Sequence, residues 1–225
     1  MTELSEGMRP IPPDTRAGFA LVAWADMAPE EEPRFNEWYN REHMRDRVLR
    51  FPSVLRGRRY GAVEGGPKYL AIYDAADAGV FSHPDYVSLV TAPDPLSHHF
   101  IMRFKNAHRT ISRIAFAFGE GEGAALALWA LPPEGEGPDG AALRAVAEKA
   151  LGAAGVVGAR LLVHDEDATA ASTRDHVRQG NKVLHRTLIL EAMDLDHLHA
   201  AASRLDVTVG AAHHVSFRLL YRVSK

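Results

Sequence analysis

The sequence contains no cysteine, which excludes disulfide bonds, catalytic thiolates, iron–sulfur clusters and cysteine-ligated zinc. It also lacks any apolar run of the roughly 20 residues that a membrane-spanning helix needs. The first residues, MTELSEGMRPIPPDTR, are acidic and contain proline, unlike the apolar centre of a secretory signal. We therefore expect a cytoplasmic protein with no membrane partner.

The chain has no excess of positive charge either, because the net charge is −3 and both signs are spread along the sequence. A protein that neutralises many phosphates needs a basic patch, so nucleic acid is not an expected partner. The G-x-G-x-x-G, P-loop, H-E-x-x-H and G-x-S-x-G motifs are missing, which argues against dinucleotide cofactors, nucleotide hydrolysis, zinc proteases and α/β-hydrolases. We expect no cofactor and no metal. A metal site between residues 164–167 and 213–214 is a weaker alternative, because that spacing matches no known motif.

The composition that remains is that of a globular protein, with 46% hydrophobic and 24% charged residues over 225 positions. Three prolines and the lack of a hydrophobic period predict a flexible arm over residues 1–16. The glycine-rich segment Gly119–Gly123 is the one strong boundary signal inside the chain. It divides the sequence into a first half, 17–120, and a second half, 121–225.

Each half shows the same order of predicted elements, strand, helix, two strands, helix and strand. The predicted ranges are strand 18–25, helix 31–50, strands 54–60 and 69–73, a proline-interrupted helical region to about 104 and strand 111–118, then strand 126–131, helix 141–151, strands 156–163 and 183–191, helix 195–205 and strand 214–223. This β-α-β-β-α-β order is ferredoxin-like and implies an internal duplication. We predict an α+β protein in which two tandem ferredoxin-like halves pack as one barrel.

Three segments carry a resemblance to a known family: FNEWYNREH at 35–43, FPSVLRGRRY at 51–60 and GGPKYLAIY at 65–73. Together they resemble the dimeric α+β barrel superfamily, and within it the EthD-like and related uncharacterised proteins. The resemblance covers about residues 18–118. It departs from the family pattern after His43, where Met44-Arg45 stands in place of a nearby proline. The second half lacks the Trp-Tyr and Glu-His pairs, so we expect one working site in the first half and a structural copy in the second.

The resemblance implies a range of activities, because the superfamily includes cofactor-free monooxygenases, isomerases, cyclases, haem proteins and members with no known activity. For the same reason, a homo-oligomer is possible, and the sequence does not decide the oligomeric state. His98-His99 lies in the second helical region of the first half, and a haem ligand there is a minor alternative.

The predicted helix 31–50 carries the first candidate residues. At 100° per residue one stripe is formed by Phe35, Trp38, Tyr39, Glu42, Asp46 and Leu49, with His43 at its edge. An imidazole can move protons at neutral pH, so His43 is the candidate general base or acid, oriented by Glu42. Tyr39 or Tyr60 would stabilise developing oxyanion charge. The alternative is structural: Glu42 and Asp46 pair with nearby arginines while His43 covers the edge of the core.

Other side chains of the first half are candidates for contact with substrate. Arg58 or Arg59 would hold a carboxylate through paired N–H donors. Trp38 and Tyr73 would line an aromatic pocket, and His99 would reach the same cleft from its opposite wall.

We therefore expect a cofactor-independent enzyme that acts on a small aromatic or polyketide-like carbonyl compound by proton transfer at His43. The reaction would be of the isomerase, lyase or oxygenase type. The alternative is a non-catalytic module for ligand binding or oligomerisation. A cavity of about 300 Å³ or more beside His43 favours the enzyme, whereas a filled cleft favours the module.

Overall fold

The computed structural model describes residues 17–174, 176–209 and 214–225, so the arm expected at 1–16 lies outside the described residues. The strands of the described chain are β1 (Phe19–Asp26), β2 (Val54–Glu64), β3 (Tyr69–Ala75), β4 (Lys105–Phe118), β5 (Ala125–Leu131), β6 (Val156–His164), β7 (Arg186–Ala192) and β8 (Val215–Ser224). The α-helices are α1 (Glu32–Trp38), α2 (Met44–Arg50), α3 (Pro84–Thr91), α4 (Pro95–Ile101), α5 (Gly140–Leu151), α6 (Glu166–Thr173) and α7 (Leu195–Val209). Shorter helical turns are η1 (Pro29–Glu31), η2 (Tyr39–His43) and η3 (Ala78–Ser82).

The strands close into one barrel in the order β1-β3-β2-β8-β5-β7-β6-β4, and every neighbouring pair is antiparallel. The predicted α+β class is therefore confirmed, in the form of an eight-stranded antiparallel barrel. Closure leaves no strand with an unpaired edge. The seams between the two halves of the sequence are the β2–β8 and β4–β6 pairs.

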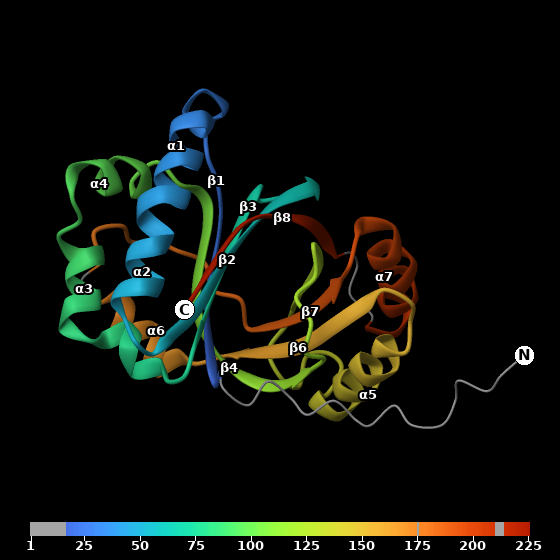
Figure 1. Ribbon diagram of the computed structural model, residues 1–225. Coiled ribbons are helices and arrows are strands. Elements are labelled where there is room, and N and C mark those ends of the chain that lie inside the picture. The colour runs from blue at the N-terminus through green and yellow to red at the C-terminus, as the bar shows by residue number, and fades with distance from the viewer. Residues whose placement is uncertain (1–16, 175, 210–213) are drawn as a thin grey trace, which may run out of the picture.

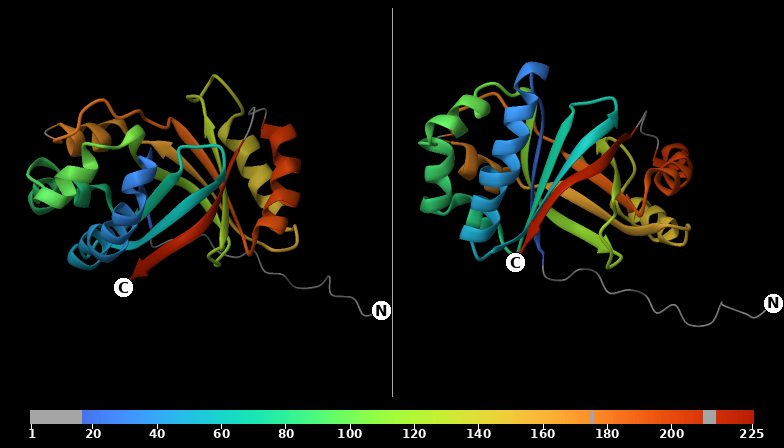
Figure 2. Two further views of the ribbon diagram at one scale, coloured as in Figure 1. Left: turned by 90° about the horizontal axis from the view of Figure 1, so that it is seen from above. Right: turned by 45° about the horizontal axis from the view of Figure 1, so that its top comes forward.

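Helices cover the barrel on two sides (Figure 1). On one side lie α5 and α7, and on the other lie α1, α2, α3, α4 and α6. Helix α6 follows β6 in the second half of the sequence, yet it contacts β4 and η3 and lies among the helices of the first half, as two further views show (Figure 2). None of the described helices is long and apolar enough to cross a membrane.

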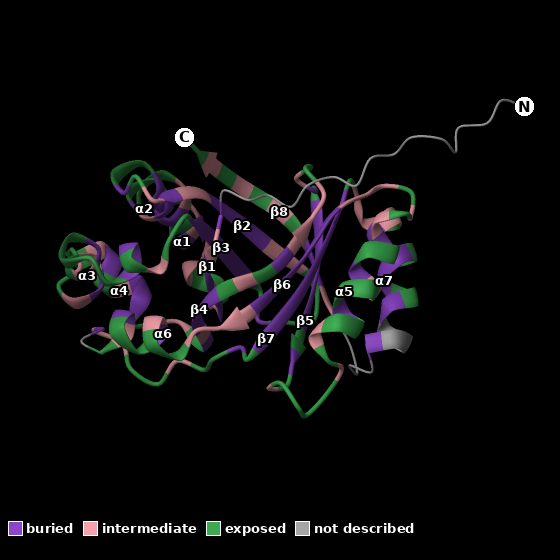
Figure 3. Cartoon of the chain, turned by 90° about the horizontal axis from the view of Figure 1, so that it is seen from below, coloured by how far each residue is buried: buried purple, intermediate pink, exposed green. Residues whose placement is uncertain are grey.

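Side chains alternate between the two faces of each strand, so the barrel has an inner core and two outer cores. The inner core includes Val22, Leu70 and Phe217, and the outer cores lie beneath the two groups of helices. Buried residues accordingly concentrate in the strands and on the helix faces that meet them (Figure 3). The outer core beneath α1, α2, α3 and α4 is the one that contains the candidate site.

The glycine-rich segment at the boundary is packed tightly against the barrel. Gly119 has a φ of +85°, and a Cβ there would lie 2.2 Å from the carbonyl oxygen of Val157. Glycine is needed because any side chain would collide with β6. The segment between β4 and β5 is therefore in close contact with β6.

Candidate functional site

The long helix predicted over 31–50 is present, but it contains a π turn, η2, between α1 and α2. A π turn holds one extra residue, which rotates everything after it by about 100° around the helix axis. Trp38 and Tyr39 are buried as predicted, whereas the next inward residues are Met44 and Val48. The predicted continuation of the stripe is therefore wrong: Glu42, Asp46 and Leu49 are exposed.

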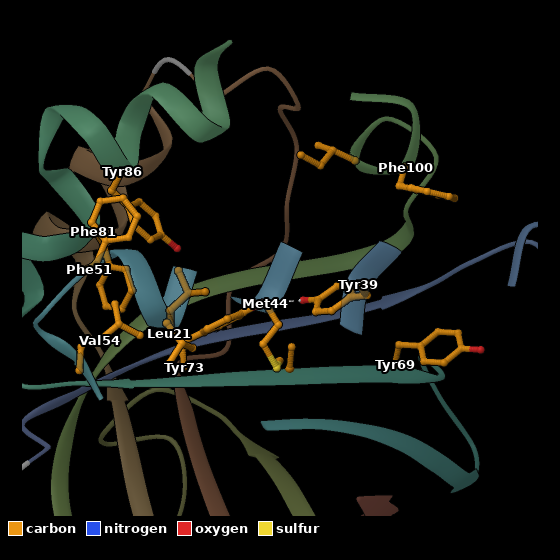
Figure 4. Packing of buried hydrophobic residues seen from close by; sticks show 14 of the residues in the cluster. Leu21, Tyr39, Met44, Phe51, Val54, Tyr69, Tyr73, Phe81, Tyr86 and Phe100 are labelled. Carbon is orange, nitrogen blue, oxygen red and sulfur yellow. Dashed lines mark hydrogen bonds between the residues drawn. The ribbon is translucent and has the colours of Figure 1, made fainter. Parts of the chain in front are cut away.

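A cavity of about 80 Å³ lies between this helix and the outer face of β1, β3 and β4. Its floor contains three alanines: Ala23 pairs with Ala71 on β3, and Ala25 pairs with Tyr69. These small side chains leave the space that the helices above do not fill. Figure 4 shows the aromatic part of this layer, where Tyr39, Tyr73 and Tyr86 lie between helices and strands.

His43 reaches the cavity from the end of the π turn. Its ring packs against the rings of Trp38 and Tyr39, with centroid distances of 4.4 and 4.6 Å. Its Nδ1 atom is buried and has no hydrogen-bond partner among the described residues. Burial lowers the pKa of His43 well below its usual value, and the positive charges of Arg47 and Arg59 lower it further. His43 is therefore a neutral imidazole at pH 7.

Two tyrosine hydroxyls meet in the same cavity. The Tyr73 hydroxyl donates a hydrogen bond to the Tyr39 hydroxyl over 3.2 Å, and both residues are buried. Burial raises the pKa of each phenol, so both are protonated at neutral pH. Because Tyr39 accepts from Tyr73, its own proton is available to a ligand.

Arg59 forms part of the cavity wall. Its guanidinium donates to the side-chain oxygens of Asn36 and Asn40, at 2.6 and 3.1 Å, and lies 4.7 Å from the ring centres of Tyr39 and Tyr69. Arg59 and Tyr69 also line an open groove of about 640 Å³ beside β2 and β8. One layer of side chains therefore separates the cavity from a larger surface groove.

The structure brings together four of the candidate residues: Tyr39, His43, Arg59 and Tyr73 all line the cavity. Trp38 does not line it but supports the His43 ring and donates from Nε1 to Ser97 Oγ over 3.3 Å. Trp38 is thus a packing residue behind the candidate base.

Two further candidates, Glu42 and His99, do not line the cavity. Glu42 is exposed, since the π turn rotates it out of the cavity, and it cannot orient His43 from there. His99 lies 3.1 Å from the Glu31 carboxylate through its Nε2 atom and does not line the cavity.

Tyr60 and Arg58 face the inside of the barrel, because strand β2 sends alternate side chains inward. Tyr60 belongs to the inner core, and burial raises its pKa. Arg58 donates to Glu191 at 2.8 Å and to Asp74 at 3.0 Å within a buried ionic network. Neither residue can contact a ligand in the cavity.

Several cavity residues were missed. Arg47 lies one helical turn beyond His43, and this spacing was a usable signal. Arg109 on β4 and Tyr86 on α3 are also in the wall. The second half was expected to be structural, yet the segment after α6 contributes His176 and Arg178. No local sequence pattern predicts that crossing.

No cluster of three or more potential metal ligands is present among the described residues. The alternative metal site included His213, which lies outside the described part of the chain. The described histidines at the cavity are His43, His108 and His176, and their charged neighbours are arginines or, for His108, Lys182. Positive neighbours disfavour a cation, so the cavity is not suited to a metal ion.

Neither a protein-family model nor a curated protein matches this chain. Solved structures do. The chain is similar to an anthrone oxidase-like protein, with 10% identity, 96% of each chain covered and a TM-score of 0.63. It is also similar to a candidate monooxygenase from Fusobacterium nucleatum, with 11% identity, 93% of this chain and 95% of the other covered, and a TM-score of 0.60. A haem-binding protein from Thermus thermophilus matches with 11% identity, 94% and 95% coverage and a TM-score of 0.53. At these identities the likeness shows the fold, that of an α+β barrel.

Proposed function

We propose that this protein is an enzyme that removes a proton from a carbon next to a carbonyl group, with His43 as the general base. The observation that carries this proposal is the buried, unpartnered Nδ1 of His43 beside a cavity. In its Nε2–H tautomer the neutral imidazole has a free lone pair on Nδ1 and is a base at pH 7. An unsatisfied buried polar atom costs stability, so its presence beside a cavity favours a functional role.

Groups in the cavity account for both the proton and the electron pair of the transfer. The substrate C–H bond breaks, the proton moves to the His43 imidazole, and the electron pair delocalises to give an enolate. The Tyr39 hydroxyl, polarised by the hydrogen bond from Tyr73, donates to the enolate oxygen. Return of the proton to a second carbon completes an isomerisation, and loss of a leaving group completes a lyase reaction.

An oxygenase reaction is the third outcome, in which the enolate carbon, derived from a CH₂ group, forms a C–O bond with molecular oxygen, and the resulting peroxide takes up the proton from His43 and loses water to leave a carbonyl group. It draws support from the structural likeness to an anthrone oxidase-like protein and a candidate monooxygenase. The proton transfer is common to all three outcomes, so the choice among them does not change the role proposed for His43.

The cavity size limits the substrate. Sites for drug-sized ligands usually have about 300–1,000 Å³, whereas this cavity has about 80 Å³. We therefore propose a carbonyl compound of few heavy atoms in place of the expected polyketide-like one. A larger aromatic substrate would require Arg59 to move and join the cavity to the neighbouring groove.

A haem group does not fit the cavity. A porphyrin needs a flat slot several times larger than about 80 Å³, and Tyr39, Tyr73 and Tyr86 pack across the available space. No step of the proposed reaction involves haem, although haem-binding and chlorite dismutase proteins share the fold.

We also interpret the architecture as a duplication of a ferredoxin-like unit. The spatial order β4-β1-β3-β2 in the first half is repeated as β8-β5-β7-β6 in the second. Each strand of one half thus has a counterpart in the other, with α6 as an addition between β6 and β7. In this interpretation the first half carries the reaction, and the added helix brings part of the second half to it.

The second candidate function is non-catalytic binding of a small ligand, which the limited volume favours. Hydrogen–deuterium exchange between the substrate and the solvent distinguishes the enzyme from the binding module. Small carbonyl compounds are incubated with the protein in D₂O, and deuterium entry at the carbon next to the carbonyl is followed by NMR. We expect exchange with the unaltered protein and a loss of about 10²-fold or more in His43→Gln. Glu42→Gln is the matched control, because Glu42 is adjacent but exposed.

Binding without exchange would identify the module instead. Equal exchange in the unaltered protein and in His43→Gln would remove His43 from the mechanism.

A further inference from the structure

Besides Arg59, two arginines in the cavity wall are buried without a carboxylate partner among the described residues. Arg47 is 4% exposed, and its Nη1 donates to the main-chain oxygen of His43 over 3.2 Å. Arg109 is 9% exposed, and its Nη1 donates to Ser172 Oγ over 2.7 Å. In the described part of the chain, neither guanidinium has an acidic side chain within 4 Å.

The rest of the cavity offers no negative charge either. Its described lining contains the arginines Arg47, Arg59, Arg109 and Arg178 but no aspartate or glutamate. The inside of the barrel shows the opposite arrangement, since the equally buried Arg58 and Arg160 pair with Asp74 and Glu191. Inside the barrel, buried arginines therefore have carboxylate partners.

A buried charge without a counter-ion is costly, because desolvation is not offset by an attractive partner. Arginine stays protonated under these conditions, and its planar fork matches a carboxylate with two parallel N–H donors. An anionic ligand would consequently supply the negative charge that the buried guanidinium groups lack.

We propose that the cavity selects an organic carboxylate, held through Arg47 and Arg109, so that the substrate is a small oxo acid rather than a neutral ketone or lactone. This inference rests on the proposed function for the assignment of the ligand as substrate, but not for the binding itself. The cavity volume of about 80 Å³ accommodates the carboxylate and a few further heavy atoms. Arg59, held by Asn36 and Asn40, remains in the wall and is not needed for this contact.

A bound carboxylate would also act on two of the cavity histidines. Burial and the positive charge of Arg47 lower the pKa of His43, and burial with the charges of Arg109 and Arg178 lowers the pKa of His176 to about 4. The negative charge of a ligand opposes these effects, so both values rise when it binds. A higher pKa makes the neutral His43 imidazole a stronger base for the proton transfer.

The experiment compares acids with their neutral amides at equilibrium, by calorimetry on the full-length chain. Pyruvate is paired with pyruvamide and acetoacetate with acetoacetamide, and sodium chloride and sodium nitrate are tested as plain anions. We expect each acid to bind about tenfold or more tightly than its amide. We expect Arg47→Met and Arg109→Met to lose this preference and Arg109→Lys to keep part of it. Arg144→Met, at an exposed position of α5 outside the cavity, should leave it unchanged.

NMR titration provides a readout that does not depend on the variants. The pKa of His43 should rise when pyruvate or acetoacetate is added to the unaltered protein, and it should not change with the amide. Equal affinity for acids and amides, chloride binding as tight as that of the acids, or an unchanged His43 pKa would each overturn the proposal.

The two proposals fail separately. Tight binding of acids with no deuterium exchange would leave carboxylate recognition intact and remove the enzyme assignment. Exchange on neutral ketones without preference for acids would do the reverse.

Discussion

Arg47 donates a hydrogen bond to the main-chain oxygen of His43, the residue one turn before it, and both side chains face the same cavity. The candidate base and a buried cation are thus fixed by one short stretch of helix. This arrangement depends on the π turn Tyr39–His43, because a regular α-helix would leave His43 at the edge of the buried face and turn Arg47 away from the sheet.

Deleting Arg41 from the π turn should convert it to an α-helical turn and misplace the following helix. Met44 and Val48, both fully buried, would rotate outward, and losing such side chains from a core costs about 2–5 kcal/mol. Urea denaturation should show a loss of this order. Arg41→Ala is the control and should change stability by less than about 0.5 kcal/mol, because Arg41 is exposed. A deletion variant as stable as the control would contradict the role given to the π turn.

The position of the π turn could not be predicted from the sequence. The apolar spacing through Phe35, Trp38 and Tyr39 fits an ordinary helix, and the next polar residues fit one equally well. The eight strands and their order were predicted correctly, because their periods and turn residues are local signals, whereas helix α6 (Glu166–Thr173) was not predicted. The face of the helix after His43 was wrong, because one extra residue in a turn leaves no local mark.

The sequence also could not predict which side chains of β2 face into the barrel and which face outward. Arg58 and Arg59 are adjacent and chemically identical, yet one lies inside the barrel with Asp74 and the other lines the cavity. An antiparallel sheet usually keeps charge off its buried face, so a pattern with arginine on both faces is ambiguous. Only the pairing of β2 with β8 resolves it, and that pairing joins segments about 160 residues apart.

Arg59→Ala should join the cavity to the neighbouring groove. The side chain forms the wall between the two spaces and leaves a gap when it is truncated. We expect the variant to bind larger carbonyl compounds, such as two-ring aromatic acids, that the unaltered protein excludes, and calorimetry measures this. Arg218→Ala is the control, because Arg218 lines the groove but not the cavity. If the ligand range stays the same in Arg59→Ala, Arg59 does not separate the two spaces.

Ala71→Leu should fill the cavity from its floor. Ala71 is buried and lines the cavity, so a larger side chain has space there and should block ligand binding with little loss of stability. The same change at Ala127, which is buried in the other outer core, has no such space and should cost about 1–3 kcal/mol. Thermal unfolding and calorimetry on both variants check the contrast. Equal destabilisation of the two would mean that the cavity does not accept added volume.

Asp74→Asn should strongly destabilise the barrel. Asp74 is fully buried and contacts three arginines, Arg56 at 2.6 Å, Arg160 at 2.7 Å and Arg58 at 3.0 Å. These positive charges hold its pKa below the usual range. Removing one partner of a buried ion pair typically costs about 3–5 kcal/mol. Urea denaturation measures the loss, and Glu148→Gln, in an exposed pair with Arg144, should cost under about 1 kcal/mol. Similar losses in both variants would show that the network is not needed for the fold.

The pH profile of deuterium exchange tests most directly whether the neutral imidazole of His43 is the base. Its pKa is lowered by burial, so the basic form is already complete near pH 7 and is lost only as the pH falls through the lowered value. We predict that the exchange rate, measured at substrate concentrations well below saturation so that it reports the ligand-free His43, is constant from about pH 6.5 to 8 and declines in acid, with a loss of about 10²-fold in His43→Gln across this range. A rate that still rises between pH 6.5 and 8, or one that is the same in His43→Gln, would contradict the account.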